Sequence, residues 1–235
     1  MDHNNILGTV LAGGKSQRFG EDKSQVRLEG TLLIDYILSE IKDEFKEILI
    51  VSNNKIHFKN SEKISMIADF EKGQGPLGGV LSAMKWVKQK NKDYKWISTF
   101  PADTPFFKRE ILQKFFKEIK IEESRLFFIK SNNTRHNIFG LWSIDLLGEL
   151  EEDLKKGDRK VELWANKVGV KVIDIEFIKH KIEYKIITNN DLSSLMNFII
   201  DKLKRYQAEV DDLDTFTFEE NLPLLFKRKS QVRVL

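Results

Sequence analysis

A glycine-rich loop stands between a short strand and an amphipathic helix near the start of the chain. Residues 6–10 form a mostly apolar run that predicts a buried strand, and residues 31–41 carry apolar side chains at helical spacing. A long loop between a strand and a helix is a place where open α/β sheets bind ligands. The sequence therefore predicts an α/β fold with a ligand loop close to its amino terminus.

The composition of this loop favours an anion site. Its first residues are small or apolar, namely Leu11, Ala12, Gly13 and Gly14. Glycines let the backbone approach a ligand closely, and successive N–H groups in such a turn can bind phosphate. Lys15, Arg18 and Lys23 add positive charge, and Arg18 can make two parallel hydrogen bonds to one phosphate. We expect a polyanion such as a nucleoside triphosphate, although the loop matches neither G-x-x-x-x-G-K-[ST] nor G-x-G-x-x-G. The alternative is a solvated surface loop.

Two further predicted strands end in polar residues. Residues 47–51 and 64–68 form short apolar runs, which are followed by Asn53 and Asp69. Polar residues just past a strand lie at the ligand-binding edge of a parallel sheet. Asn53 is therefore a candidate contact for a base or ribose, with a simple turn as the alternative. Asp69, taken alone, is more typical of a helix cap or a solvated loop residue.

A second glycine-rich stretch, residues 73–79, opens a predicted helix that continues to Val87. Pro76 suits a helix start, because the N–H that proline lacks would be unpaired there. The free N–H groups of such a terminus attract anions or ligand carbonyls. Each glycine in the first turn costs about 1 kcal/mol relative to alanine. We therefore expect a ligand to pack against bare backbone here, with Gly75 and Gly79 as candidate contacts.

Asp103 follows a predicted central strand at residues 96–100 and lies between Pro101 and Pro105. The two prolines stiffen the turn and fix the direction of the carboxylate. Mg²⁺ binds one or two carboxylates together with substrate phosphates rather than a cage made only of protein ligands. We therefore expect Asp103 to hold Mg²⁺. The alternative is that Asp103 caps the helix predicted at residues 108–119.

Together these motifs resemble the molybdenum cofactor guanylyltransferase (MobA) branch of the nucleotidyltransferases with a GT-A-like α/β fold. The loop L-A-G-G-K-S-x-R-F-G-x-D-K of residues 11–23 carries the resemblance most clearly, and the similarity extends from about residue 6 to about residue 197. It implies that Asp69 contacts the nucleotide and that the second glycine-rich stretch lies against guanine. It also implies that P-x-D-x-P-F places a metal at Asp103.

The resemblance implies Mg²⁺-dependent transfer of GMP from GTP to molybdenum-bearing molybdopterin, which yields the guanine dinucleotide cofactor and pyrophosphate. Asp103, Lys23 and Arg18 are the expected catalytic residues. The expected nucleotide contacts are Leu11, Ala12, Gly13, Gly14, Lys23, Asn53, Asp69, Gly75, Gly79 and Asp103. The alternatives are the use of CTP or of a different phosphorylated acceptor, or a non-catalytic adaptor that binds nucleotide or cofactor. Maturation proteins of molybdoenzymes are expected as transient partners.

The second half of the chain carries fewer motifs. Residues 125–130 and 137–142 predict two strands joined by a turn. The basic turn at residues 157–160 resembles the G-x-R segment of the family, which could hold the phosphate of the second substrate, although a solvated charged turn fits equally. Residues 186–192 depart from the family's asparagine-rich signature, so the residues that bind the pterin are not identified from the sequence.

The alternation of strands and helices up to about residue 120 predicts a doubly wound, mostly parallel α/β sheet, Rossmann-like, with antiparallel additions in the second half. We expect one nucleotidyltransferase domain at residues 1–205 and a C-terminal extension of unknown role at 206–235. The net charge of +3 comes from 39 basic and 36 acidic residues that are interspersed, which does not indicate nucleic-acid binding. Without cysteines or a long apolar run, we expect a cytoplasmic protein with no membrane partner. The oligomeric state is not indicated.

Overall fold

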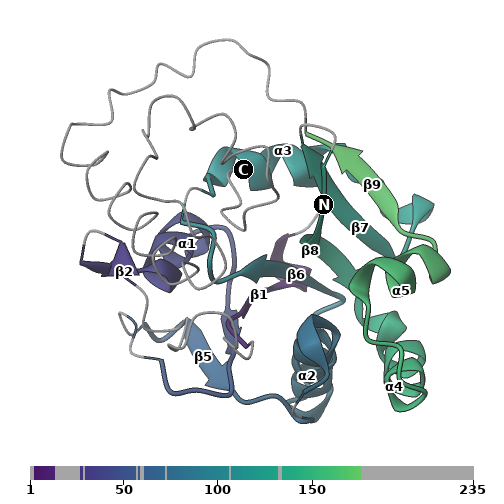
Figure 1. Cartoon of the computed structure of the whole chain (residues 1–235). Coiled ribbons are helices and arrows are strands. Elements are labelled where there is room, and N and C mark those ends of the chain that lie inside the picture. The colour runs from purple at the N-terminus through teal and green to yellow at the C-terminus, as the bar shows by residue number, and fades with distance from the viewer. Residues whose placement is uncertain are drawn as a thin grey trace, which may run out of the picture.

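A seven-stranded sheet runs through the part of the chain that the computed structural model describes, which comprises residues 3–13, 27–28, 30–56, 58, 61–71, 73–105, 107–131 and 134–175 (Figure 1). In order across the sheet, the strands are β5 (Ile64–Ile67), β4 (Ile48–Val51), β1 (Ile6–Leu11), β6 (Trp96–Pro101), β8 (Thr134–Ser143), β7 (Leu126–Ser131) and β9 (Lys171–Asp174). Four of the neighbouring pairs are parallel, and β8 is antiparallel to both β6 and β7. The predicted doubly wound, mostly parallel sheet with antiparallel additions is confirmed.

The central strands are buried on both faces. Strand β1 lies between β4 and β6, with Val10 paired to Ile50 on one side and to Phe100 on the other. All residues of β4 and β6 are buried. Strands that are covered on both faces read as continuous apolar runs rather than as an alternating pattern. This is why the sequence located these three strands within a residue of their observed ends.

Helices cover both faces of the sheet. On one face lie α1 (Leu33–Ile41) and α3 (Arg109–Glu118), and on the other lie α2 (Gly75–Gln89), α4 (Leu147–Lys155) and α5 (Val161–Lys167) (Figure 1). Each set of helices packs its apolar side chains into a separate buried cluster against the sheet. Short 3-10 turns occur at His3–Asn5, Ile121–Glu123 and Ile144–Leu146. The fold therefore has the three-layer architecture that alternating strands and helices predict.

The first helix begins later than the sequence predicted. Residues 31 and 32 form strand β3 (Thr31–Leu32), which pairs with β2 (Arg27–Leu28) in a small antiparallel ladder. Leu32 has an extended backbone, with ψ at 142°. The prediction was wrong at this end because a β-branched residue and a leucine at the edge of a helical pattern fit either structure.

The hairpin of β7 and β8 supplies the antiparallel part of the sheet. Its register shifts between Phe128 and Ile129, which is a local bulge. A Cβ atom at Gly140 would lie 2.6 Å from the backbone oxygen of Phe127, which is far too close. Glycine is therefore required at this position, where the two strands and the ring of Phe128 approach one another.

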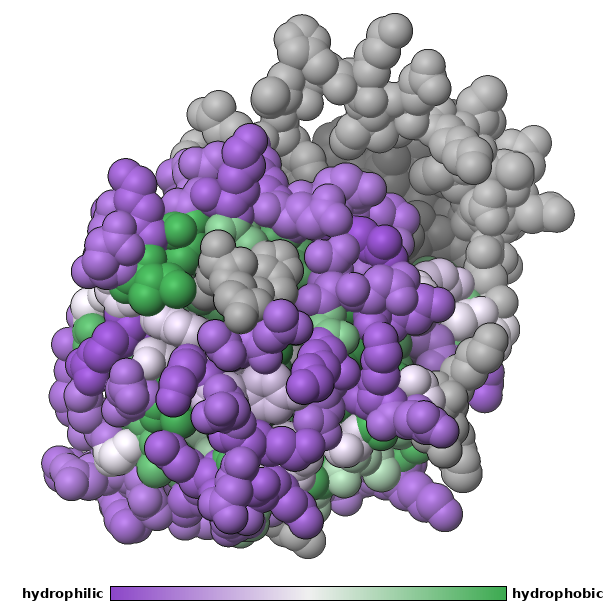
Figure 2. Space-filling view, turned by 180° about the vertical axis from the view of Figure 1, so that it is seen from behind, coloured by the Kyte–Doolittle hydropathy of each residue, from purple (hydrophilic) through white to green (hydrophobic). Residues whose placement is uncertain are grey.

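Seen from behind, the surface is mainly hydrophilic, with small hydrophobic patches (Figure 2). The larger exposed apolar side chains among the described residues are Met66, Phe70, Ile121 and Leu163. Within the described ranges, no helix has the length and the apolar character needed to cross a membrane. The predicted pterin segment at 186–192 and the extension at 206–235 lie outside the described residues, so the domain boundary at residue 205 stays a prediction.

Candidate functional site

The loops that follow β1, β4, β5 and β6 meet the start of α2 at one edge of the sheet. The N–H of Ala12 donates to the oxygen of Val51 at 2.9 Å, and the N–H of Ala102 donates to the oxygen of Leu11 at 3.2 Å. The predicted site residues at this edge are Leu11, Ala12, Gly13, Asn53, Asp69, Gly75, Gly79 and Asp103. We call this set the candidate site. The predicted residues Gly14, Arg18 and Lys23 lie outside the described residues.

Asn53 and Asp69 bind each other across the ends of β4 and β5. The side-chain amide of Asn53 donates to Oδ2 of Asp69 at 2.7 Å, and the backbone N–H of Asp69 donates to Oδ1 of Asn53 at 3.2 Å. Burial raises the pKa of the Asp69 carboxyl, and the hydrogen bond from Asn53 partly opposes this rise. Oδ1 of Asp69 is buried and has no hydrogen-bond partner in the described part of the chain. A buried acceptor of this kind requires a donor, which a ligand can supply.

Two glycines from different loops flank this carboxylate. A Cβ atom at Gly13 would lie 3.5 Å from Oδ2 of Asp69, and a Cβ atom at Gly79 would lie 3.7 Å from Oδ1. At Gly79 the added atom would also lie 3.1 Å from Cδ2 of Leu11. The space around Asp69 is therefore bounded by bare backbone on two sides. Bare backbone at these two positions is what a close approach of a ligand to the chain would require.

The start of α2 combines Gly75 and Pro76, which the sequence analysis singled out, with Ser82, which it did not. Gly75 adopts a φ of +65°, which glycine accepts without strain, and Pro76 follows it in the first turn. Buried Ser82 accepts a hydrogen bond from the N–H of Phe70 at 3.0 Å and donates to the oxygen of Gly78 at 2.8 Å. Ser82 therefore fastens the loop after Asp69 to the helix. Its signal in the sequence is a single hydroxyl on the otherwise apolar buried face of α2.

Asp103 lies exposed in the turn that follows β6. Buried Thr104 holds this turn, because its hydroxyl donates to the oxygen of Pro101 at 2.8 Å. The N-cap of α3 is Lys108, with no side-chain capping bond, so the alternative that Asp103 caps this helix is wrong. Within the described ranges, no group of three or more His, Cys, Asp or Glu side chains could hold a metal. A single exposed carboxylate is nevertheless a donor that suits Mg²⁺ when phosphates complete the shell.

Two arginines reach the same edge from the second half of the chain. The Nε of Arg159 donates to Oε1 of Gln74, the N-cap of α2, at 2.8 Å. Arg135, at the start of β8, donates from Nε to Asn137 at 2.7 Å and from Nη1 to Asn166 of α5 at 2.8 Å. The basic turn at 157–160 is thus placed beside the second glycine-rich stretch. No pattern in the sequence indicates the Gln74 contact.

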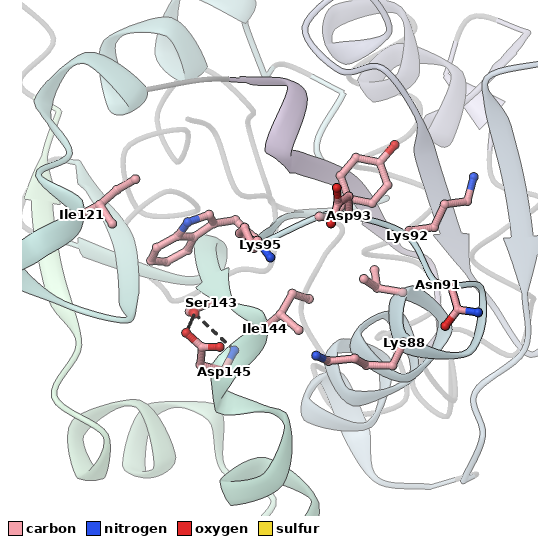
Figure 3. Close-up of a pocket in the computed structure, with 12 residues that line it drawn as sticks. Lys88, Asn91, Lys92, Asp93, Lys95, Ile121, Ser143, Ile144 and Asp145 are labelled. Carbon is pink, nitrogen blue, oxygen red and sulfur yellow. Dashed lines mark hydrogen bonds between the residues drawn. The ribbon is translucent and has the colours of Figure 1, made fainter.

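A polar cavity of about 540 Å³ lies at the opposite edge of the sheet (Figure 3). Lys88, near the end of α2, points across it towards Asp145, and the hydroxyl of Ser143 donates to Asp145 at 3.1 Å. Trp96, the first residue of β6, also lines this cavity, whereas the candidate site follows the last residue of β6. The motif residues therefore do not line the cavity, and we assign it no part in the candidate site.

Comparisons with known proteins identify the family to which the chain belongs. The family model described as "MobA-like NTP transferase domain" matches residues 8–168. A protein of Aquifex aeolicus named "Probable molybdenum cofactor guanylyltransferase" is 27% identical over 81% of this chain and 88% of its own length. The molybdenum cofactor guanylyltransferase of Nitrobacter hamburgensis is 28% identical over 67% of this chain and 77% of its own length. The crystal structure of molybdopterin-guanine dinucleotide biosynthesis protein A from Archaeoglobus fulgidus shares the fold, with a TM-score of 0.59, 22% identity, and coverage of 85% of this chain and 96% of that chain.

Proposed function

Because the chain belongs to the family of MobA-like NTP transferase domains and is a nucleotidyltransferase, we propose that it transfers GMP from GTP to molybdenum-bearing molybdopterin. The products of this reaction are the guanine dinucleotide form of the cofactor and pyrophosphate. The names of the relatives support the choice of substrates, and the candidate site supplies the independent physical support.

The surroundings of Asp69 are the observation that carries the proposal. Oδ1 of this carboxylate is buried without a partner in the described part of the chain, beside the bare backbone of Gly13 and Gly79. Guanine presents two adjacent donors, N1–H and the N2 amino group, which match a carboxylate. Cytosine and adenine instead present one amino group beside an acceptor nitrogen. A carboxylate therefore favours GTP over CTP and ATP, because cytosine or adenine would set an acceptor nitrogen against one of its oxygens and unmatched polar groups in a site carry a large penalty.

The chemistry of the transfer requires little covalent work by the protein. An oxygen of the acceptor's phosphate forms a bond to the α-phosphorus of GTP, and the bond from that phosphorus to the bridging oxygen breaks as pyrophosphate leaves. Gly13 would hold the phosphates through backbone N–H groups, together with Gly14, Arg18 and Lys23 from outside the described residues. Asp103 would hold Mg²⁺, which when bound neutralises the phosphate oxygens and makes the α-phosphorus more electrophilic.

The acceptor would approach from the half of the molecule that contains β8, β7 and α5, where Arg159 lies next to the nucleotide loops. We further propose that the reaction takes place in the cytoplasm and that contact with maturation proteins of molybdoenzymes is transient. GTP and the molybdopterin cofactor are then the two substrates, and Mg²⁺ is the metal.

A multiple-turnover assay of the full-length protein tests this proposal. With GTP, Mg²⁺ and molybdenum-bearing molybdopterin, we expect one pyrophosphate for each guanine dinucleotide formed. Faster turnover with CTP than with GTP would identify CTP as the nucleotide substrate. Binding of nucleotide and cofactor with no pyrophosphate release would instead identify a non-catalytic adaptor and contradict the proposal.

A further inference from the structure

One hydrogen bond joins the nucleotide loops to the second half of the chain. The Nε of Arg159 donates to Oε1 of Gln74 at 2.8 Å, although the two residues are 85 positions apart. Gln74 is the N-cap of α2, and Arg159 lies just before α5 on the same face of the sheet (Figure 1). The contact is therefore placed between the loop proposed to bind the base and the basic turn at 157–160.

The way in which Arg159 is held leaves its best anion-binding atoms available. Among the described residues, the hydrogen bond to Gln74 is the only hydrogen bond or ion pair of this side chain. The two Nη groups form the planar fork that grips a phosphate through parallel hydrogen bonds. Since the side chain of Gln74 is neutral, it fixes the plane of the guanidinium without neutralising its charge.

Arg135 provides an internal contrast. Its Nε and Nη1 are both bound to side-chain amides, of Asn137 and Asn166, and its Nη2 lies 3.5 Å from the carboxylate of Glu162. Arg135 is thus held by two hydrogen bonds, of which the one to Asn166 fastens α5 to β8, while its Nη2 is buried beside Glu162 without a hydrogen-bond partner among the described residues. Arg159 is held through Nε only, which leaves its two Nη groups available to bind an anionic ligand.

Gln74 is itself held in place by its neighbours. Its amide nitrogen lies 3.4 Å from Oε2 of Glu71, and its oxygen accepts from Arg159. A Cβ atom at Gly78 would lie only 2.6 Å from the Cβ of Gln74, so glycine at 78 leaves room for this side chain over the first turn of α2. The orientation of Gln74 therefore depends on the same glycine-rich turn that we propose to bind the nucleotide.

We infer that Gln74 is a positioning residue that holds Arg159 against the phosphate of the acceptor substrate. This inference rests on the proposed function, because it takes the acceptor to be a phosphomonoester. The contact orients the guanidinium before the acceptor arrives, which lowers the cost of ordering a long side chain during binding. The nucleotide loop thus contributes to binding of the second substrate through a residue that touches neither phosphate nor base.

The test replaces Gln74 by methionine, which keeps the length of the side chain and removes its hydrogen-bonding oxygen. Gln113→Met is the matched control, because Gln113 is an exposed glutamine of α3 whose amide donates to Glu44 at 3.0 Å on the other face of the sheet. We expect Gln74→Met to raise the KM for the acceptor about five- to tenfold, which is the usual net contribution of one hydrogen bond. The kcat and the Kd for GTP should stay within about twofold of the control, since the proposed reacting groups are unchanged.

A double variant separates positioning from mere proximity. If Gln74 acts only through Arg159, Gln74→Met combined with Arg159→Met should be no worse than Arg159→Met alone. An unchanged acceptor KM in Gln74→Met, a change confined to GTP, or additive effects in the double variant would each overturn the inference while the proposed function stands. Absence of turnover in the wild-type protein would overturn the proposed function and this inference with it.

Discussion

Asp69 and Asp103 differ in burial, and this difference separates their proposed roles. Asp69 is partly buried beside Asn53, and burial raises the pKa of its carboxyl. A carboxylate in such a place is suited to accept hydrogen bonds from a neutral base. Asp103 is exposed at the end of β6, where a charged carboxylate can meet a hydrated cation and the phosphates it carries.

Replacing Asp103 by alanine should abolish turnover and leave the fold intact. The side chain is exposed, so its removal leaves no cavity, whereas the loss of a metal ligand removes charge stabilisation worth at least about a hundredfold in rate. The measurements are pyrophosphate release and the thermal unfolding midpoint. Asp93→Ala, an exposed aspartate at the opposite edge of the sheet, is the matched control. Full activity in Asp103→Ala would remove the metal assignment.

The sequence predicted single site residues from local signals, but it did not predict the hydrogen bonds that these residues make to distant segments. Asn53 and Asp69 were each recognised as polar residues at the end of a strand, because that signal is local. Their mutual hydrogen bonds depend on β4 and β5 being neighbours in the sheet, which no local pattern encodes. The contact between Gln74 and Arg159 likewise arises only once the sheet and its helices are assembled.

At the scale of elements, the start of α2 is a place where binding and helix stability make opposite demands. Gly79→Ala should weaken GTP binding by about tenfold or more, equivalent to about 1.4 kcal/mol. The added methyl group would lie 3.7 Å from Oδ1 of Asp69, in the space proposed for the base. Stability should be unchanged or slightly higher, because alanine is better than glycine in a helix by about 1 kcal/mol and the side chain of Leu11 can give way.

The control for this prediction is Gly148→Ala in α4, where an added Cβ would meet nothing within 4 Å. This variant should gain stability without any change in GTP affinity. Calorimetric titration with GTP and thermal unfolding of both variants separate the two effects. Equal GTP affinity in Gly79→Ala and wild type would show that no ligand packs against this turn.

Helices α4 and α5 are joined by a buried carboxylate that makes the stability of the protein depend on pH. Asp153 accepts hydrogen bonds from Lys167 at 2.8 Å and from the indole of Trp164 at 3.0 Å. The hydrogen bond from Lys167, followed by that from Trp164, lowers the pKa of Asp153 below its usual value of 3.8. Its contribution to stability is therefore fully present above about pH 5 and is lost as the pH falls through 3.8 and towards the lower folded-state pKa.

Asp153→Asn should consequently be less stable than wild type at pH 6, and the difference should shrink towards pH 3. Urea unfolding at several pH values measures this directly. Asp43→Asn, at an exposed aspartate paired with Arg109, should show a much smaller difference at every pH because solvent screens such pairs. A stability difference for Asp153→Asn that stays constant from pH 6 to pH 3 would contradict the assignment.

Strands that are completely buried were predicted from the sequence, whereas short and exposed elements were not. The apolar runs of β1, β4 and β6 located those strands, and Pro76 located the first turn of α2. The two-residue ladder of β2 and β3 was missed, because two residues are too few for a period to show.

At the scale of the whole molecule, the sheet runs in one direction except for β8, which is reversed between β6 and β7. The strands β5, β4, β1 and β6 lead to the motif residues, whereas Arg135 lies at the start of β8 and Arg159 lies in the turn that joins α4 to α5. The alternation of strands and helices predicted this doubly wound form. The insertion of β8 between β6 and β7, and the parallel pairing of β9 with β7, could not be read from the sequence because strand order is set by long-range packing.

The central claim is that the edge of the sheet where β1, β4, β5 and β6 end binds GTP with Mg²⁺. Calorimetric titration of the purified full-length protein with GTP, CTP, ATP and UTP, each with and without Mg²⁺, tests it most directly. We expect tight, Mg²⁺-dependent binding of GTP, with the other nucleotides weaker by about tenfold or more, because guanine alone of the four bases presents two adjacent donors to the carboxylate of Asp69, whose Oδ1 has no partner among the described residues. Preferential binding of CTP, or no binding of any nucleotide, would contradict the account.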